Sequence, residues 1–91
     1  MMNEINILKL FYDEMKVRGE TRDNVFLSIN ETATNILSEK LGYSVTLEEA
    51  QHATDICIAN EWLERTTIDP GYNFLSLTAA GLQIVLANQY T

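Results

Sequence analysis

The pattern of apolar and polar positions predicts four helices in this chain of 91 residues. Apolar residues recur every three or four positions over residues 3–17, 30–41, 47–60 and 78–89, which is the spacing of an amphipathic helix. The inward faces of the first two helices carry Ile5, Leu8, Phe11 or Tyr12, Met15, Ala33, Ile36, Leu37 and Leu41. Those of the last two carry Ala50, Ala53 or Thr54, Cys57, Ile58, Leu82, Val85 and Leu86.

Polar residues and one glycine mark where the middle helices begin and end. Asn30 or Thr32 is suited to cap the second helix, and Gly42 to end it in a left-handed conformation. Thr46 with Glu49 forms a capping box, so the third helix begins at the residue after the threonine. Because only about four residues join these two helices, we expect them to cross steeply, as in a helix-turn-helix unit.

Between the third and last helices the pattern changes to that of a β-hairpin. Residues 62–68 form a β-rich run, residues 69–71 (Asp-Pro-Gly) form a turn, and residues 74–77 form a returning strand. Trp62 is predicted to pack beneath the hairpin as part of the core. Tyr72 is predicted to lie exposed at the tip, where an amphipathic aromatic side chain is suited to contact a partner.

This order of elements resembles the winged helix-turn-helix superfamily. The returning strand runs into Leu77, Thr78 and Gly81, which match a leucine-threonine-x-x-glycine motif often found there, with the threonine capping the closing helix. The segment SEKLGYSVTLEEAQHA resembles the turn and third helix, and residues 25–27 match a small first strand. The resemblance covers nearly the whole chain and identifies no particular family. It implies an α/β fold of the mainly helical α+β type, with a three-helix core, a small β-wing and a C-terminal helix in one domain (residues 1–91).

Composition is that of an ordered globular protein. The chain is 46% hydrophobic and 21% charged with one proline, and 91 residues suffice for one small core. No stretch approaches the roughly 20 apolar residues that span a bilayer, and the N-terminus lacks the long apolar region of a signal peptide. These features favour a cytoplasmic protein with no membrane contact.

Residues with catalytic or metal-binding chemistry are few. Cys57 is the only cysteine, which excludes an internal disulfide, and its core position favours a buried thiol over a nucleophile. His52, the only histidine, lies three residues after Glu49 and three before Asp55, a set too poor in ligands for a transition metal. The four glycines are isolated, so no glycine-rich phosphate loop is present. We therefore expect no enzyme activity, no cofactor and no metal.

The distribution of charge argues against DNA binding through the third helix. In DNA-binding members of the superfamily this helix enters the major groove and the wing touches the backbone, with arginine and lysine neutralising phosphates. Here residues 46–60 and 66–73 contain no lysine or arginine. From residue 30 to residue 61 six acidic residues stand against one lysine, so most of the net charge of −7 lies on the unit that would face DNA.

The leading expectation is therefore a small non-enzymatic module that acts through protein–protein contacts. An acidic helix surface suits a basic partner, and such a domain is able to mimic nucleic acid toward a DNA-binding protein. The residues expected to contact the partner are Glu48, Glu49, His52, Asp55 and Tyr72.

Two further expectations concern the first helix. A homodimer through the first and last helices is predicted, because these residues add apolar surface beyond one core stripe: Ile7, Leu10, Ile84 and Leu86. The alternative function is a transcription regulator that binds DNA through four of the six basic residues: Lys9, Lys16, Arg18 and Arg22.

Overall fold

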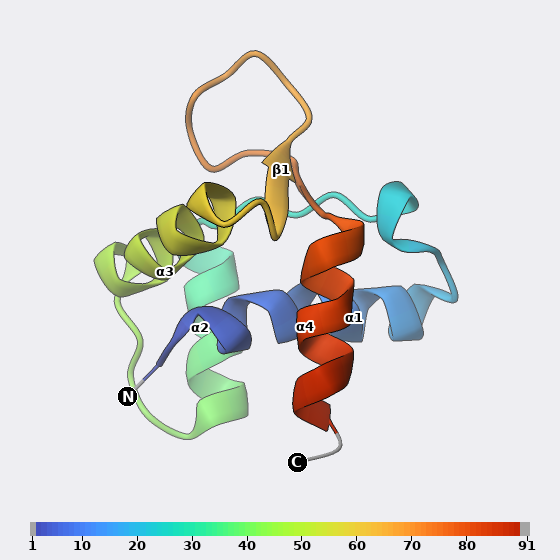
Figure 1. The fold of residues 1–91 in the computed structure, drawn as a ribbon. Coiled ribbons are helices and arrows are strands. Elements are labelled where there is room, and N and C mark those ends of the chain that lie inside the picture. The colour runs from blue at the N-terminus through green and yellow to red at the C-terminus, as the bar shows by residue number, and fades with distance from the viewer. Residues whose placement is uncertain (1, 90–91) are drawn as a thin grey trace.

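The computed structural model describes residues 2–89, which form a mainly helical α+β domain with four α-helices, a short 3-10 helix and one two-stranded antiparallel sheet (Figure 1). The elements are α1 (Glu4–Arg18), η1 (Arg22–Asn24), α2 (Glu31–Leu41), α3 (Leu47–Ala59), β1 (Leu63–Arg65), β2 (Leu75–Leu77) and α4 (Ala79–Gln89). None of the helices within residues 2–89 is both long and apolar enough to cross a membrane.

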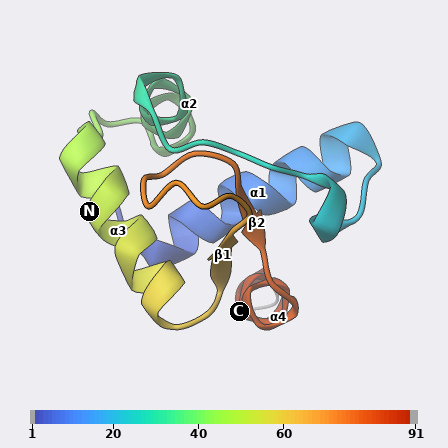
Figure 2. The same cartoon turned by 90° about the horizontal axis from the view of Figure 1, so that it is seen from above.

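Helix α1 lies at the centre of the domain. It packs against α3, α4 and β2, and Figure 2 shows it passing beneath the sheet. Its fully or nearly buried side chains include Ile7 and Leu10, which are 0% and 4% exposed. The prediction that these two residues add apolar surface for a homodimer is therefore wrong. A helix with neighbours on several sides needs a wider apolar stripe than one core-facing row provides.

The helix boundaries follow the capping residues. Asn30, rather than Thr32, caps α2 through its side-chain oxygen, and Gly42 ends that helix with φ 77°. Thr46 and Glu49 form the predicted capping box of α3. One predicted core position of α2 is wrong, because Ile36 is 37% exposed.

The sheet is shorter than the sequence predicts. Strand β1 pairs with β2 from Leu63 opposite Leu77 to Arg65 opposite Leu75, so the residues from 66 to 68 lie outside the strand. The predicted first strand is reduced to one bridge, in which Leu27 and Leu75 exchange backbone hydrogen bonds of 3.0 and 2.8 Å. Residues 66–74, here called the hairpin loop, connect the two strands.

A close backbone contact joins β1 to the start of α4. The Thr78 amide donates to the Trp62 carbonyl oxygen (3.0 Å), and the Thr78 hydroxyl accepts from the Gly81 amide (3.0 Å) as the predicted cap. A Cβ atom added at Gly81 would lie 2.1 Å from the Trp62 carbonyl oxygen. Only glycine permits this approach, which explains why the threonine and the glycine occur three residues apart.

The end of α3 forces Glu61 into a left-handed conformation. The Trp62 amide donates to the Cys57 carbonyl (2.9 Å) and the Glu61 amide to the Ile58 carbonyl (3.0 Å), which is the Schellman arrangement. Glu61 has φ 61°, a value that glycine adopts without strain and glutamate does not. This reversal directs the chain from α3 into β1.

Candidate partner-binding site on helix α3

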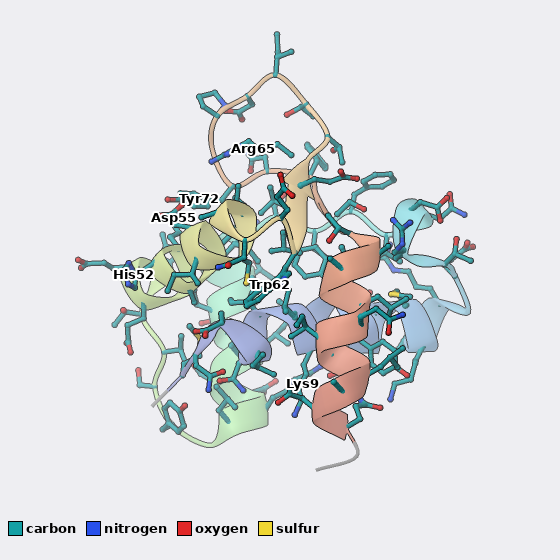
Figure 3. The ribbon with its side chains drawn as sticks, viewed as in Figure 1. Lys9, His52, Asp55, Trp62, Arg65 and Tyr72 are labelled. Atoms are coloured by element: carbon teal, nitrogen blue, oxygen red, sulfur yellow. The ribbon has the colours of Figure 1, made fainter. Side chains whose placement is uncertain are left out.

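A groove of about 460 Å³ lies between the exposed side of α3 and the hairpin loop. It brings together four of the five residues that the sequence predicts to contact a partner, namely Glu48, His52, Asp55 and Tyr72. Leu47 and Gln51 complete the lining. Figure 3 shows Tyr72 and Asp55 side by side, with His52 farther along α3. The lining side chains include two carboxylates and no lysine or arginine.

Tyr72 connects the hairpin loop to α3. Its hydroxyl donates to both carboxylate oxygens of Asp55, at 2.9 and 3.1 Å, and its backbone carbonyl accepts from the Ile29 amide at 2.8 Å. The prediction that Tyr72 lies exposed at the hairpin tip is therefore corrected, because the loop folds back against α3 and the residue is half-buried. The hydrogen bond to Asp55 raises the pKa of Tyr72, because the ionised phenol loses its bond and faces a carboxylate.

Glu49 lies outside the groove lining and serves the start of α3. Its carboxylate accepts from the backbone amide of Thr46 (3.1 Å) and from the Thr46 hydroxyl (3.0 Å). The Glu49 amide in turn donates to that hydroxyl oxygen at 3.1 Å. The side chain therefore stabilises the helix and adds negative charge next to the groove, but it is not free to rotate toward a partner without breaking the cap.

The hairpin loop is organised by Asp69. Its carboxylate accepts from the Gly71 amide (2.9 Å) and from the Asn73 side-chain amide (3.0 Å), and the bond from Asn73 is the main reason that the pKa of Asp69 is lowered. Arg65, which the sequence analysis did not single out, donates to the Gly71 carbonyl at 3.2 Å. The role of Arg65 could not be assigned from spacing, because its bond to Gly71 forms only when the loop closes.

The thiol and the histidine offer little chemistry. Burial raises the pKa of Cys57 to about 12, with a smaller contribution from Glu4, and the sulfur lies 3.5 Å from the Glu4 carbonyl oxygen. The thiol is thus protonated at neutral pH and a poor nucleophile. Within residues 2–89 no three histidine, cysteine or acidic side chains gather in a way that would hold a metal ion.

Three of the four basic residues of the alternative DNA site contact groups within the chain. Arg22 donates from Nη1 to the Leu77 carbonyl (3.4 Å), and Arg18 pairs with Glu14 (2.9 Å). The Lys16 ammonium lies 4.8 Å from the centre of a tyrosine ring one turn earlier in α1. Glu14 offsets the charge of Arg18, and all three contacts reduce the freedom of these side chains to reach a phosphate.

Lys9, the fourth, lies in a hollow of about 190 Å³ between α1 and α2. The same hollow is lined by Asp13 and Lys40, whose side chains form an ion pair of 2.7 Å. The hollow therefore holds two ammonium groups and one carboxylate rather than an uninterrupted basic patch.

Fold and groove together define a small α+β domain with an acidic groove on α3. The chain matches no protein-family model, and comparisons with curated proteins and with solved structures give no match. Its activity is therefore inferred from the residues that form its surface.

Proposed function

We propose that this chain is a small non-enzymatic winged-helix module that acts through protein–protein contacts, with a basic partner or with a second copy. The order of elements supports the winged-helix assignment: α2 and α3 stand as the helix-turn-helix, the hairpin as the wing, and α4 as the closing helix. Protein contact is favoured over DNA because the surface that the superfamily presents to DNA is acidic here.

The groove on α3 is the observation that carries this proposal. Glu48 and Asp55 place two carboxylates on either side of His52, and the Tyr72 ring closes one end. A lysine or arginine side chain from a partner would find an anion and an aromatic face within the same groove. Exposed ion pairs contribute about 0.2 to 1 kcal/mol each, so useful affinity requires several contacts with a surface of opposite charge.

Mimicry of nucleic acid is a sharper form of the same proposal. Glu48 and Asp55 lie on the helix that corresponds to the DNA-reading helix of the superfamily, and their carboxylates would stand in for phosphates, while Glu49 adds negative charge beside them from the cap. A DNA-binding protein or nuclease with a basic cleft is the class of partner that fits.

The alternative, a transcription regulator, is supported by the order of elements alone. The acidic residues of α3 argue against this alternative, because a carboxylate about 6 Å from a phosphate repels it by about 1 kcal/mol in water.

Binding of a lysine- and arginine-rich peptide, compared with a random DNA duplex over a range of salt, tests the proposal. We expect peptide binding that weakens as salt rises and no useful duplex binding at about 150 mM salt. Glu48→Lys should weaken peptide binding about fivefold, because one ion pair of about 1 kcal/mol is lost. Glu48 is chosen because its side chain makes no hydrogen bond or ion pair with any residue in the described range 2–89.

Glu39→Lys is the matched control, since it makes the same charge change at an exposed position of α2. Equal loss of binding in both variants would show that net charge, rather than the groove, attracts the peptide. Sub-micromolar binding of the unmodified protein to the random duplex would overturn the proposal in favour of DNA. Lys9, Lys16, Arg18 and Arg22 would then be the residues to replace.

A further inference from the structure

A second surface, with few charges, lies near the base of the hairpin loop. A hollow of about 260 Å³ between α1, α2 and the segment that precedes α2 adjoins another of about 530 Å³ beside the loop, and Phe26 lines both. We call this surface the aromatic face and define it by six of its residues: Phe26, Ala33, Ile36, Thr66, Thr67 and Phe74. Phe26 and Phe74 remain 45% and 57% exposed.

Phe74 is an unusual residue for the conformation that it adopts. Its φ of 52° is left-handed, where a bulky side chain is strained and asparagine or glycine is favoured. The Ser28 hydroxyl accepts from its amide (3.0 Å), and Thr66 donates to its carbonyl, so the strained backbone is held in place by neighbours. Because over half of the side chain is exposed, the ring contributes little to the core. A strained backbone that displays an aromatic ring to solvent suggests a contact role.

The charge of the aromatic face limits the kind of partner that can cover it. Among the residues that line its two hollows, Glu14 alone is charged, and Arg18 neutralises it at 2.9 Å. A basic partner finds no unpaired carboxylate in that lining. Two copies of a chain with net charge −7 repel wherever acidic surfaces meet, and the lining of this face adds no unpaired carboxylate to that repulsion. Both considerations favour a second copy.

We propose that two copies of this chain associate through the aromatic face around a two-fold axis, with Phe26 and Phe74 of each facing the same residues of the other. A standard interface covers about 800 Å² per partner, which is about one-seventh of the 5358 Å² surface of this chain. The aromatic face shares no lining residue with the α3 groove, so the dimer presents two open grooves. The inference deepens the proposed function, of which contact between copies is one form.

Sedimentation between about 1 µM and about 1 mM protein tests the inference. We expect association that strengthens as salt rises, because ions screen the repulsion between two acidic copies, whereas binding of the basic peptide weakens. Phe74→Asn should weaken association at least tenfold without lowering the melting temperature, since asparagine suits the left-handed backbone. Val17→Asn is the control, because Val17 is 81% exposed and lies outside the face.

Three outcomes would overturn the inference: a monomer at every concentration and salt, association that Phe74→Asn leaves unchanged, or an equal loss in Val17→Asn. If Phe74→Asn melts at a lower temperature, Ile36→Gln on the exposed side of α2 replaces it with the same expectation. The two proposals fail separately. A monomer that binds the basic peptide overturns only the dimer, and a dimer that ignores the peptide overturns only the basic-partner reading of the groove.

Discussion

The two regions that flank strand β1 are held by different means. On one side, at the junction with α4, the Trp62 carbonyl lies so close to Gly81 that no side chain fits between them. On the other side, the hairpin loop is held by hydrogen bonds of side chains. The Tyr72 hydroxyl donates to the Asp55 carboxylate, and the Asp69 carboxylate accepts from the Gly71 amide. The junction depends on close contact between two backbone segments, and no residue other than glycine fits at position 81. The loop is fixed by separate bonds that can be removed one at a time.

The same substitution made in both regions gives the largest contrast. Gly81→Ala should destabilise the domain by about 3 kcal/mol, because the added methyl group displaces α4 from β1. Gly71→Ala in the hairpin loop should cost less than about 1 kcal/mol, since its nearest contact is the flexible Asp69 carboxylate at 3.2 Å. Urea unfolding measures both. Similar free energies of unfolding for the two variants would contradict the distinction between the regions.

Trp62→Ala separates the side chain from the backbone at the junction. The ring is half-buried and packs against the core cluster, so its loss should cost about 2 kcal/mol, less than the roughly 3 kcal/mol of a fully buried aromatic side chain. The carbonyl contact with Gly81 is retained in this variant. Thermal melts that match the parent would show that the ring contributes nothing to the stability of the fold.

Glu61→Gly should stabilise the domain by about 1 kcal/mol, because glycine relieves the left-handed strain at the entrance to β1. The end of α1 supplies the reciprocal control, since Gly19 occupies the equivalent position there with φ 65°. Gly19→Ala should destabilise by a similar amount. Chemical denaturation should show a higher free energy of unfolding for Glu61→Gly and a lower one for Gly19→Ala than for the parent. A Glu61→Gly variant that is less stable than the parent would mean that the glutamate side chain stabilises the turn.

Tyr72→Phe should have the smallest effect, about 0.5 to 1 kcal/mol, because it removes the bond to Asp55 at an accessible site. The raised pKa of Tyr72 determines how the contribution of this bond to stability depends on pH. The bond stabilises the fold below the unfolded phenol pKa of about 10, and this contribution is lost as pH rises through the higher pKa of the folded state. Unfolding free energies of parent and variant should therefore converge at alkaline pH. A constant difference would show that the lost contact is not this bond.

Local signals in the sequence predicted the helix ends correctly. Gly42 and the pair of Thr46 and Glu49 act over a few residues, so spacing alone identifies them. The acidic character of α3 could also be predicted, because capping fixes the start of the helix and periodicity then fixes its outer face.

Contacts between distant segments were beyond sequence reasoning. Ile7 and Leu10 are buried because three elements surround α1, whereas periodicity describes only the helix itself. The turn residues beside Tyr72 predict exposure, but its partner Asp55 lies seventeen positions earlier. The short β1 has the same cause. A β-rich sequence forms a strand only where a partner strand lies alongside, and β2 pairs with three residues.

The central position of α1 also sets the order in which the domain is able to form. Apart from the short η1, which also contacts α1, the main neighbours that cover α1 are α3, β2 and α4, all in the second half of the chain. During synthesis the first helix therefore emerges before the elements that cover most of its apolar stripe, and this cover is complete only when the last helix is made. Contacts so far apart along the chain slow folding relative to a bundle built from neighbours. The core around α1 is therefore completed only when α4 packs against it.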